Sequence, residues 1–174
     1  MMYVNEVPIY QLSDIADAIK YQHEVHGCRY VVTDYMQLAE VAGVKDRVEA
    51  ITIVSHTVRN TARDCGVTSI ALSQFNRETS KDYENPPTPQ GLMGGSPLEN
   101  DSDQVVLLNH AKYDRDPMTD SATTQVLLAK NRHGPLKQID VTWQYSTLRI
   151  TEQTHVTIPL PEGRGEAWEP GEAA

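Results

Sequence analysis

The chain has 174 residues, with 15 Lys and Arg against 24 Asp and Glu, for a formal net charge of −9. This charge excludes a simple basic nucleic-acid coat protein, which binds through an excess of phosphate-neutralising side chains. No apolar run approaches the roughly 20 residues that span a bilayer, and the segment Met1–Glu6 is not a secretory signal. Cys28 and Cys65 form no disulfide framework. We therefore expect one compact domain, in the cytoplasm and without a membrane partner.

The first part of the chain alternates predicted helices with short apolar strands. A helix is expected over residues 13–26, with Ser13 as its N-cap and Gly27 as its stop. A strand follows at residues 30–33. The next helix shows apolar and small residues at steps of three and four and ends before Gly66; these residues are Val48, Ile51, Ser55, Val58, Ala62 and Cys65. A second apolar strand is expected over residues 67–72.

The later part of the chain predicts a long loop, four more strands and a tail. Residues 75–102 are polar and rich in Pro and Gly, so a loop is expected there. Apolar runs at residues 104–108 and 125–129 predict strands. The segments 139–143 and 147–150 alternate like an exposed antiparallel pair. The acidic end of the chain is rich in Pro and Gly and predicts disorder.

Short apolar strands separated by helices favour an α/β fold with a mainly parallel, twisted sheet flanked by helices and a C-terminal antiparallel pair. We expect residues 1–151 to form this domain and residues 152–174 to form the disordered acidic tail. In such sheets, ligands bind beyond the carboxyl ends of the strands. The residues that follow the predicted strands are therefore candidates for chemistry: Asp34, Gln74, Lys130 and Arg132.

Each candidate has a functional and an ordinary interpretation. The carboxylate of Asp34 can hold Mg²⁺ through water opposite a nucleotide phosphate, although acidic residues end many strands. Gln74 can sense a terminal phosphate or orient a water, or be an ordinary polar residue. Lys130 and Arg132, on one face of an extended segment, suit a phosphate clamp, an arginine finger or a solvated basic turn. The glycines of residues 91–96 allow a close approach to a phosphate backbone, or form a surface loop.

Four motifs occur in a fixed order along the chain. Residues 31–38, Val-Val-Thr-Asp-Tyr-Met-Gln-Leu, resemble the Walker B segment of DnaB-type replicative helicases. Residues 71–77, Ala-Leu-Ser-Gln-Phe-Asn-Arg, look like that family's Leu-Ser-Gln-Leu-x-Arg motif. Residues 94–103 are similar to its Ser-Gly-x-Ile-Glu-Gln-Asp-Ala-Asp stretch, and residues 129–135 to its Ala-Lys-Asn-Arg-x-Gly-Pro motif. The resemblance covers about residues 7–150 and corresponds to the second half of the family's RecA-like motor domain.

The resemblance implies a role for each candidate. Asp34 would support the Mg²⁺ of bound ATP, and Gln74 would sense the γ-phosphate and couple it to a DNA-facing loop. Lys130 and Arg132 would reach the ATP of a neighbouring subunit as a trans finger pair. The residues implied near single-stranded DNA are Arg47, Met93, Gly94, Gly95 and Ser96.

Some of these DNA-facing positions depart from the family's pattern. Met93 stands where Arg is common, Gly94 where Glu is common, and Ser96 replaces a Gly. The departures imply a weaker grip on DNA, or one that backbone amides provide.

The sequence contains no GxxxxGK[ST] phosphate-binding loop and lacks the catalytic glutamate that the family carries between that loop and the Walker B strand. We therefore expect ATP and Mg²⁺ binding only with an upstream helicase half that supplies the loop, within a hexameric ring. A split gene, as in some phage genomes, or a truncated reading frame would produce such a chain in a bacterial or phage-infected cell. One alternative is a non-catalytic RecA-like subunit that binds and modulates an intact helicase; another is an inert remnant.

Overall fold

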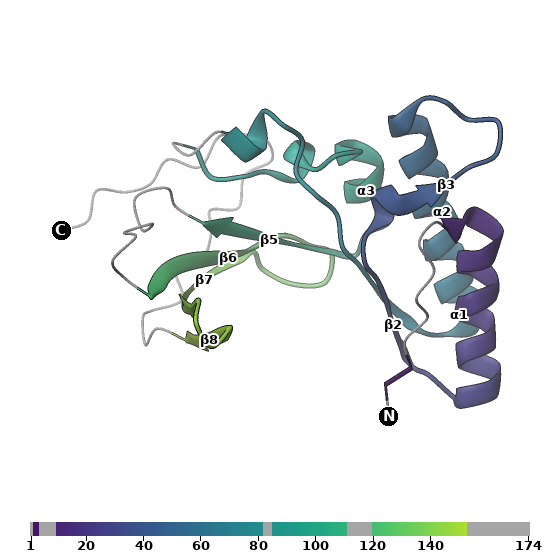
Figure 1. Cartoon of the computed structure of the whole chain (residues 1–174), viewed down its shortest axis with the longest axis horizontal. Coiled ribbons are helices and arrows are strands. Elements are labelled where there is room, and N and C mark those ends of the chain that lie inside the picture. The colour runs from purple at the N-terminus through teal and green to yellow at the C-terminus, as the bar shows by residue number, and fades with distance from the viewer. Residues whose placement is uncertain (1, 4–9, 82–84, 111–119, 153–174) are drawn as a thin grey trace. The chain divides into compact units, whose positions relative to one another are not determined.

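The computed structural model describes four stretches of the chain: residues 2–3, 10–81, 85–110 and 120–152 (Figure 1). They form two compact units. The first unit comprises Met1–Asn76 and Gln90–Ser102, and the second comprises Arg77–Pro89 and Asp103–Ala174. The acidic tail expected from residue 152 lies outside the described residues from position 153 onward.

The first unit combines three helices with short parallel strand pairs. Its elements are β1 (Tyr10–Gln11), α1 (Leu12–His26), β2 (Tyr30–Thr33), the 3₁₀ helix η1 (Met36–Leu38), β3 (Ala39–Glu40), α2 (Arg47–Cys65), β4 (Thr68–Ala71) and α3 (Gly95–Asp101). Another 3₁₀ helix, η3 (Pro89–Gly91), lies at its boundary with the second unit. β2 pairs with β4 in parallel, and β1 pairs with β3 in parallel.

The two long helices end at the predicted glycines. Gly27 and Gly66 follow α1 and α2 with φ of 64° and 67°, a left-handed conformation that glycine adopts without steric penalty. The predicted N-cap of α1 is wrong, because the helix begins at Leu12 and its cap is Gln11. The Gln11 backbone N–H donates to the Asp14 carboxylate at 3.3 Å. This bond caps the helix at Gln11, so the helix begins before Ser13.

The core of the first unit forms where α2 packs against its neighbours. Val54 of α2 is 0% exposed, and the apolar stripe continues through other buried residues of the same helix. Its partners come from α1, η1 and α3 and include Ile19, Met36 and Leu98. Val48, predicted to belong to this stripe, is 53% exposed because the buried part of the stripe begins one turn later, at Ile51.

The β2–β4 sheet is covered by helices on one face. α1 and α2 lie on the same side of this sheet (Figure 1), and Val31 packs against the helical core. Alternate residues point the other way: Tyr30 is 71% exposed, Val32 is 60% exposed and Ile70 is 47% exposed. The sequence predicts a sheet flanked by helices, and in the part of the chain that the structure describes helices cover only one face of the β2–β4 sheet. The exposed residues form one apolar patch, the β2–β4 apolar face (Tyr30, Val32 and Ile70).

The second unit is an antiparallel sheet. It contains η2 (Thr79–Lys81) and the strands β5 (Gln104–His110), β6 (Ser121–Asn131), β7 (Lys137–Gln144) and β8 (Arg149–Glu152), paired in chain order. The predicted C-terminal pair is confirmed as β7 and β8. β5 and β6, expected in a parallel sheet, are also antiparallel. Ten residues separate β5 from β6, fewer than the dozen or more that the crossover of a parallel pair requires.

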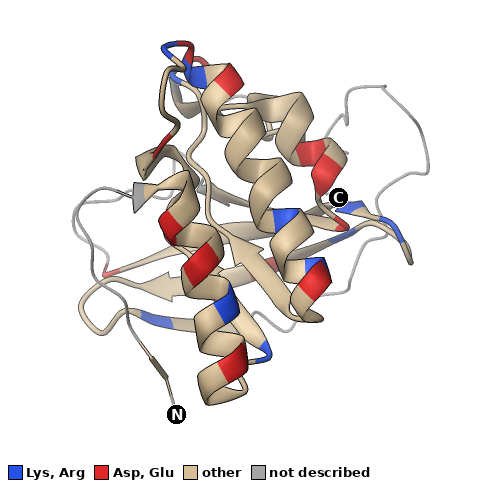
Figure 2. Ribbon diagram, turned by 90° about the vertical axis from the view of Figure 1, so that its right-hand side faces the viewer, with Lys and Arg blue, Asp and Glu red and all other residues tan. Residues whose placement is uncertain are grey.

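The helices carry mixed charge on their solvent-facing sides. Along α1, acidic and basic residues are interspersed, as the red and blue segments of this helix in Figure 2 show. The charged residues of α1 include Asp14, Asp17, Lys20 and Glu24. Within the described ranges, every helix is too short or too polar to cross a membrane.

Asp120 holds the turn between β7 and β8. The Ser146 hydroxyl donates to one oxygen of the Asp120 carboxylate, and the Ser146 backbone N–H donates to the other at 2.8 Å. The Tyr145 N–H donates to the Asp120 carbonyl at 2.8 Å. The two bonds from Ser146, above all the one from its hydroxyl, hold the pKa of Asp120 below its ordinary value.

The buried stripe of α2 predicts the stability of two valine variants. Val54→Ala should lower the free energy of unfolding by roughly 2 kcal/mol, because it removes buried methyl groups and leaves a cavity. The matched control Val48→Ala, on the exposed first turn, should change it by no more than about 0.5 kcal/mol. Urea denaturation followed by circular dichroism measures both. Equal losses for the two variants would contradict this assignment of the core.

The Asp120 hydrogen bonds predict a pH dependence. Because the folded pKa lies below the unfolded one, the ionised carboxylate stabilises the turn above pH 3.8, and this contribution disappears as the pH falls through the folded pKa. An NMR titration should place the pKa of Asp120 below 3.8. Ser146→Ala should move it back toward that value. A wild-type pKa at or above 3.8 would exclude these bonds as determinants of the turn.

Candidate functional site

The ends of β2 and β4 bring two of the predicted site residues to one edge of the parallel sheet. Beyond the paired strands, the Leu72 N–H donates to the Thr33 carbonyl and the Met36 N–H donates to the Leu72 carbonyl, both at 2.9 Å. These bonds continue the alignment of the two segments past the strands themselves. Asp34 directly follows β2 and Gln74 lies just beyond β4, and both side chains are exposed. A ligand at this edge is therefore within reach of a carboxylate and an amide.

The Asp34 carboxylate fits a magnesium ion in its donor chemistry. Mg²⁺ prefers oxygen ligands and usually keeps several waters, so that one or two protein carboxylates suffice. No group of three or more His, Cys, Asp or Glu side chains that could hold a metal occurs among the described residues. Any magnesium ion at Asp34 would thus be held mainly by water and by a phosphate-bearing ligand.

The segment after β4 pairs with the glycine-containing loop. The Met93 N–H donates to the Gln74 carbonyl at 2.8 Å, and the Asn76 N–H donates to the Gly91 carbonyl at 2.8 Å. Between them, Phe75 and Leu92 form an antiparallel bridge. We call this pairing of residues 74–76 with residues 91–93 the 74–93 ladder. It joins the end of β4 directly to the loop that the sequence suggested for phosphate contact.

Two glycines let this loop pass close to its surroundings. Gly94 has a φ of 93°, and a Cβ atom there would lie 2.5 Å from Cγ2 of Ile51 in α2. A Cβ atom on Gly95 would lie 2.6 Å from the Gln90 carbonyl oxygen. Gly94 is buried, Met93 and Gly95 are half-buried, and Ser96 is exposed. Of these four predicted contacts to DNA, Ser96 therefore presents its side chain most openly to solvent.

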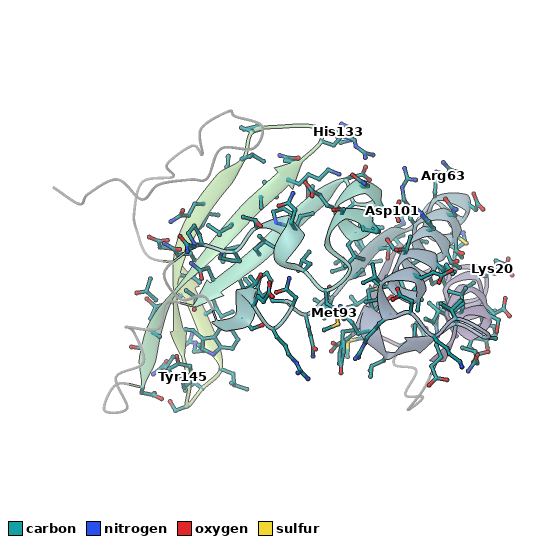
Figure 3. All side chains as sticks on the ribbon, turned by 90° about the horizontal axis from the view of Figure 1, so that it is seen from above. Lys20, Arg63, Met93, Asp101, His133 and Tyr145 are labelled. Atoms are coloured by element: carbon teal, nitrogen blue, oxygen red, sulfur yellow. The ribbon has the colours of Figure 1, made fainter. Side chains whose placement is uncertain are left out.

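The expectation of a continuous loop over residues 75–102 is wrong at its end, where α3 forms. Asp101, at the end of α3, is buried and ties this helix to α2. Its carboxylate accepts a hydrogen bond from the Ser55 hydroxyl at 2.7 Å and lies 2.8 Å from Nδ1 of His56. Met93 and Asp101, labelled in Figure 3, flank α3 at its two ends. This long-range anchor explains a helix that its short, Pro-containing sequence did not predict.

Arg47 is the remaining predicted DNA contact. It is the first residue of α2 and is exposed. The helix is capped just before it by Asp46, whose carboxylate accepts a hydrogen bond from the Glu49 N–H at 2.8 Å. This cap sets where α2 begins and therefore where Arg47 lies.

Lys130 and Arg132 belong to the second unit. Lys130 is half-buried near the end of β6, opposite Val105. Arg132 follows β6 in a turn, so the extended backbone expected to carry both residues stops between them. The Arg132 guanidinium lies 2.6 Å from the Asp103 carboxylate, and its backbone N–H donates to the Asp103 carbonyl at 2.9 Å. Because exposed ion pairs add little stability, Asp103 orients the guanidinium more than it stabilises the fold.

Asn131 shapes the turn that carries Arg132. Its Nδ2 donates to the Pro135 carbonyl at 3.1 Å, and its Oδ1 accepts from the His133 N–H at 3.4 Å. A Cβ atom on Gly134 would lie 2.9 Å from the same Nδ2. The Asn131 amide therefore leaves little room for a side chain at position 134, which accounts for the glycine there.

The sequence assigns no role to Gln37, whose side chain hydrogen-bonds to Ser73, Gln74 and Met93 in the structure. Its side chain is buried and hydrogen-bonds to residues on both sides of the 74–93 ladder. The sequence does mark this residue in one way: Gln37 is a polar residue between the apolar Met36 and Leu38 of η1, which directly follows Asp34 and Tyr35.

Residues 1–152 match the family model of the DnaB-like helicase C terminal domain. The replicative DNA helicase DnaB of Geobacillus stearothermophilus is 24% identical over 166 residues, which cover 93% of this chain and 37% of the relative. The replicative DNA helicase DnaB of Leifsonia xyli subsp. xyli is 30% identical over 158 residues, covering 89% and 34%. The chain therefore spans about a third of the length of these curated relatives.

Two solved structures resemble the fold of this chain. One is an ATPase domain, with a TM-score of 0.70 at 27% identity, over 83% of this chain and 52% of that one. The other is a DnaB-like replicative helicase, described with its interactions with primase, with a TM-score of 0.68 at 28% identity, over 81% and 35%. These matches confirm the predicted α/β class and the resemblance to RecA-like helicase domains.

The close approach at Gly94 predicts a difference between two glycine variants. Gly94→Ala and Gly43→Ala both place alanine at positive φ, but nothing lies within 4 Å of a Cβ atom at Gly43. Each change should cost about 1–2 kcal/mol for the left-handed backbone. Gly94→Ala should cost roughly 1–3 kcal/mol more, because the new methyl group overlaps Ile51. Chemical denaturation tests this, and equal costs would rule out the close packing of the loop on α2.

Proposed function

Because the chain belongs to the DnaB-like helicase C terminal domain family, we propose that it forms part of the ATP-hydrolysing motor of a replicative DNA helicase. The observation that carries this proposal is the shared edge of β2 and β4. There Asp34 and Gln74 are both exposed, and Gln74 is hydrogen-bonded through its backbone to the glycine-containing loop. A nucleotide at this edge and DNA at the loop would therefore be connected through a few residues.

We assign Asp34 to the magnesium ion of bound ATP and Gln74 to its γ-phosphate. Mg²⁺, when bound, neutralises charge on the phosphates. Asp34 would orient the ion's water ligands through its exposed carboxylate. The Gln74 amide would hydrogen-bond to the γ-phosphate while its backbone carbonyl keeps the bond from Met93. The loss of this phosphate on hydrolysis would then change the position of Gln74 and, through its bond to Met93, the position of the loop.

Lys130 and Arg132 would act on the ATP of a neighbouring subunit in a ring. From the family resemblance we expect this ring to be a hexamer. A guanidinium supplied in trans stabilises the charge that develops during phosphoryl transfer. The turn shaped by Asn131 and the contact with Asp103 support such a role for Arg132, since both restrict its position before a nucleotide arrives.

Single-stranded DNA would contact Arg47 and the loop of residues 93–96. Arg47 and Ser96 are exposed and would meet phosphates through a guanidinium and a hydroxyl. Gly94 is buried against Ile51, so its part would be to hold the loop in place, together with Gly95. Backbone amides of this loop would supply the remaining contacts to phosphate.

The phosphate-binding loop would come from outside residues 1–174, since these contain no GxxxxGK[ST] sequence. The exposed β2–β4 apolar face supports this view. Isolated two-stranded sheets are marginal in water, and a further strand with its helix would cover the face and extend the sheet.

Complementation tests the proposal. Residues 1–174 alone should hydrolyse no ATP in response to single-stranded DNA. Combined or fused with the part of a DnaB-type motor domain that carries GxxxxGK[ST], they should do so. In that combination, Arg132→Ala should lower kcat roughly 10³-fold or more. Steady-state ATPase assays with single-stranded DNA measure each step.

Arg149→Ala is the matched control, because Arg149 is an exposed arginine on β8 in the same unit. It should leave kcat unchanged. Full activity of Arg132→Ala would remove the trans finger assignment. Stimulation of an intact helicase by residues 1–174, without restoration of the missing half, would favour the alternative of a non-catalytic modulating subunit.

A further inference from the structure

The Gln37 side chain connects three separate segments of the first unit. Its Nε2 donates to the Ser73 hydroxyl at 2.7 Å and to the Met93 carbonyl at 3.2 Å. Its Oε1 accepts a hydrogen bond from the Gln74 backbone N–H at 3.4 Å. One planar amide thus contacts the segment after β4 and the glycine-containing loop at once.

The chemistry of these partners fixes the orientation of the amide. The Met93 carbonyl can only accept, so it requires the NH₂ group, and the Gln74 N–H can only donate, so it requires the oxygen. Gln74 and Met93 are also joined directly, because the Met93 N–H donates to the Gln74 carbonyl at 2.8 Å. Gln37 therefore closes a ring of hydrogen bonds with the two backbones. A shift of either backbone changes the bonds of the other.

The backbone on either side of Gln37 is held by burial and by hydrogen bonds. Met36, its neighbour, is 1% exposed within the helical core, and the Met36 N–H donates to the Leu72 carbonyl at 2.9 Å. The Leu38 N–H donates to the Tyr35 carbonyl at 3.1 Å and closes the turn. The amide is therefore held on the segment that begins with Asp34, while its contacts reach Gln74 and Met93.

The three contacts differ in length, and the longest is the one to Gln74. A hydrogen bond of 3.4 Å is weaker than one of 2.7 Å, so a displacement of Gln74 would alter this contact first. Because a buried amide that loses a partner pays a desolvation penalty, the remaining bonds to Ser73 and Met93 would adjust. The loop would then move with the end of β4.

We propose that Gln37 is a positioning residue that couples the end of β4, at Gln74, to the position of the loop at Met93. This inference rests on the proposed function, in which Gln74 senses the phosphate and the loop faces DNA. Gln37 touches neither nucleotide nor DNA in this scheme. Its contribution is to make the two sites respond together.

The ATPase test compares Gln37→Met with Gln90→Met in the complemented assembly. Gln90 is an exposed amide of the same region that donates to Glu99 at 2.8 Å, outside the Gln37 contacts. Gln37→Met should keep the DNA-independent kcat and the KM for ATP but lose most of the stimulation by single-stranded DNA. Gln90→Met should keep all three. An equal loss of basal and stimulated rates, or full stimulation, would overturn the proposal.

Gln37→Glu adds a pH readout that a merely structural role would not produce. The ionised carboxylate keeps an acceptor for the Gln74 N–H but has no hydrogen to donate to the Met93 carbonyl. Lowering the pH through the pKa of the new carboxyl restores one O–H donor. Stimulation by DNA should therefore return in part at low pH in this variant, relative to the wild type at the same pH. No recovery would count against the proposal.

Hydrogen exchange on residues 1–174 alone separates this inference from the proposed function, because it needs no ATP hydrolysis. Loss of the Gln37 bridge should make the Met93 amide exchange roughly tenfold faster in Gln37→Met than in the wild type. The amides of α2 serve as an internal reference for global unfolding. Unchanged exchange at Met93 would overturn the coupling role even if complementation succeeds. Faster exchange without ATPase activity would support the bridge and refute the motor assignment.

Discussion

β2 and β4 pair in parallel, and the positions of Asp34 and Gln74 depend on this pairing. The hydrogen bonds from Leu72 to Thr33 and from Met36 to Leu72 extend the alignment beyond the strands. Asp34 and Gln74 consequently meet at one edge, and Gln37, a few residues after Asp34, reaches the segment that follows β4. A carboxylate, an amide and a loop that are far apart in sequence thereby become parts of one hydrogen-bonded arrangement.

α2 covers the sheet and also positions the glycine-containing loop. Its buried stripe holds the core, and its other contacts place the glycine-containing loop: Ile51 lies against Gly94, and Ser55 and His56 bind Asp101 at the far end of α3. The loop is therefore held at both ends by one rigid helix. The 74–93 ladder links the loop to the end of β4, and Gln37 bonds to both sides of this ladder.

The second unit restricts a cation by different means. The exposed pair of Arg132 with Asp103 has little effect on stability, but with the Asn131 turn it limits where the guanidinium can lie. Such restriction is useful for a group that must meet a phosphate, because less side-chain entropy is lost on binding. In both units, short polar contacts at the ends of strands hold functional candidates, while apolar packing elsewhere provides the support.

The sequence by itself determined the long helices, the approximate strands, the strand-end residues and the family resemblance. These depend on local signals: periodicity along α2, the left-handed glycines after each helix, and motifs in a fixed order. Only the tertiary structure decided the exposed face of β2 and β4, the existence of α3 and the contacts of Gln37. Each of these arises between residues distant in sequence, such as Asp101 with Ser55 or Gln37 with Met93, and no local pattern encodes such a partner.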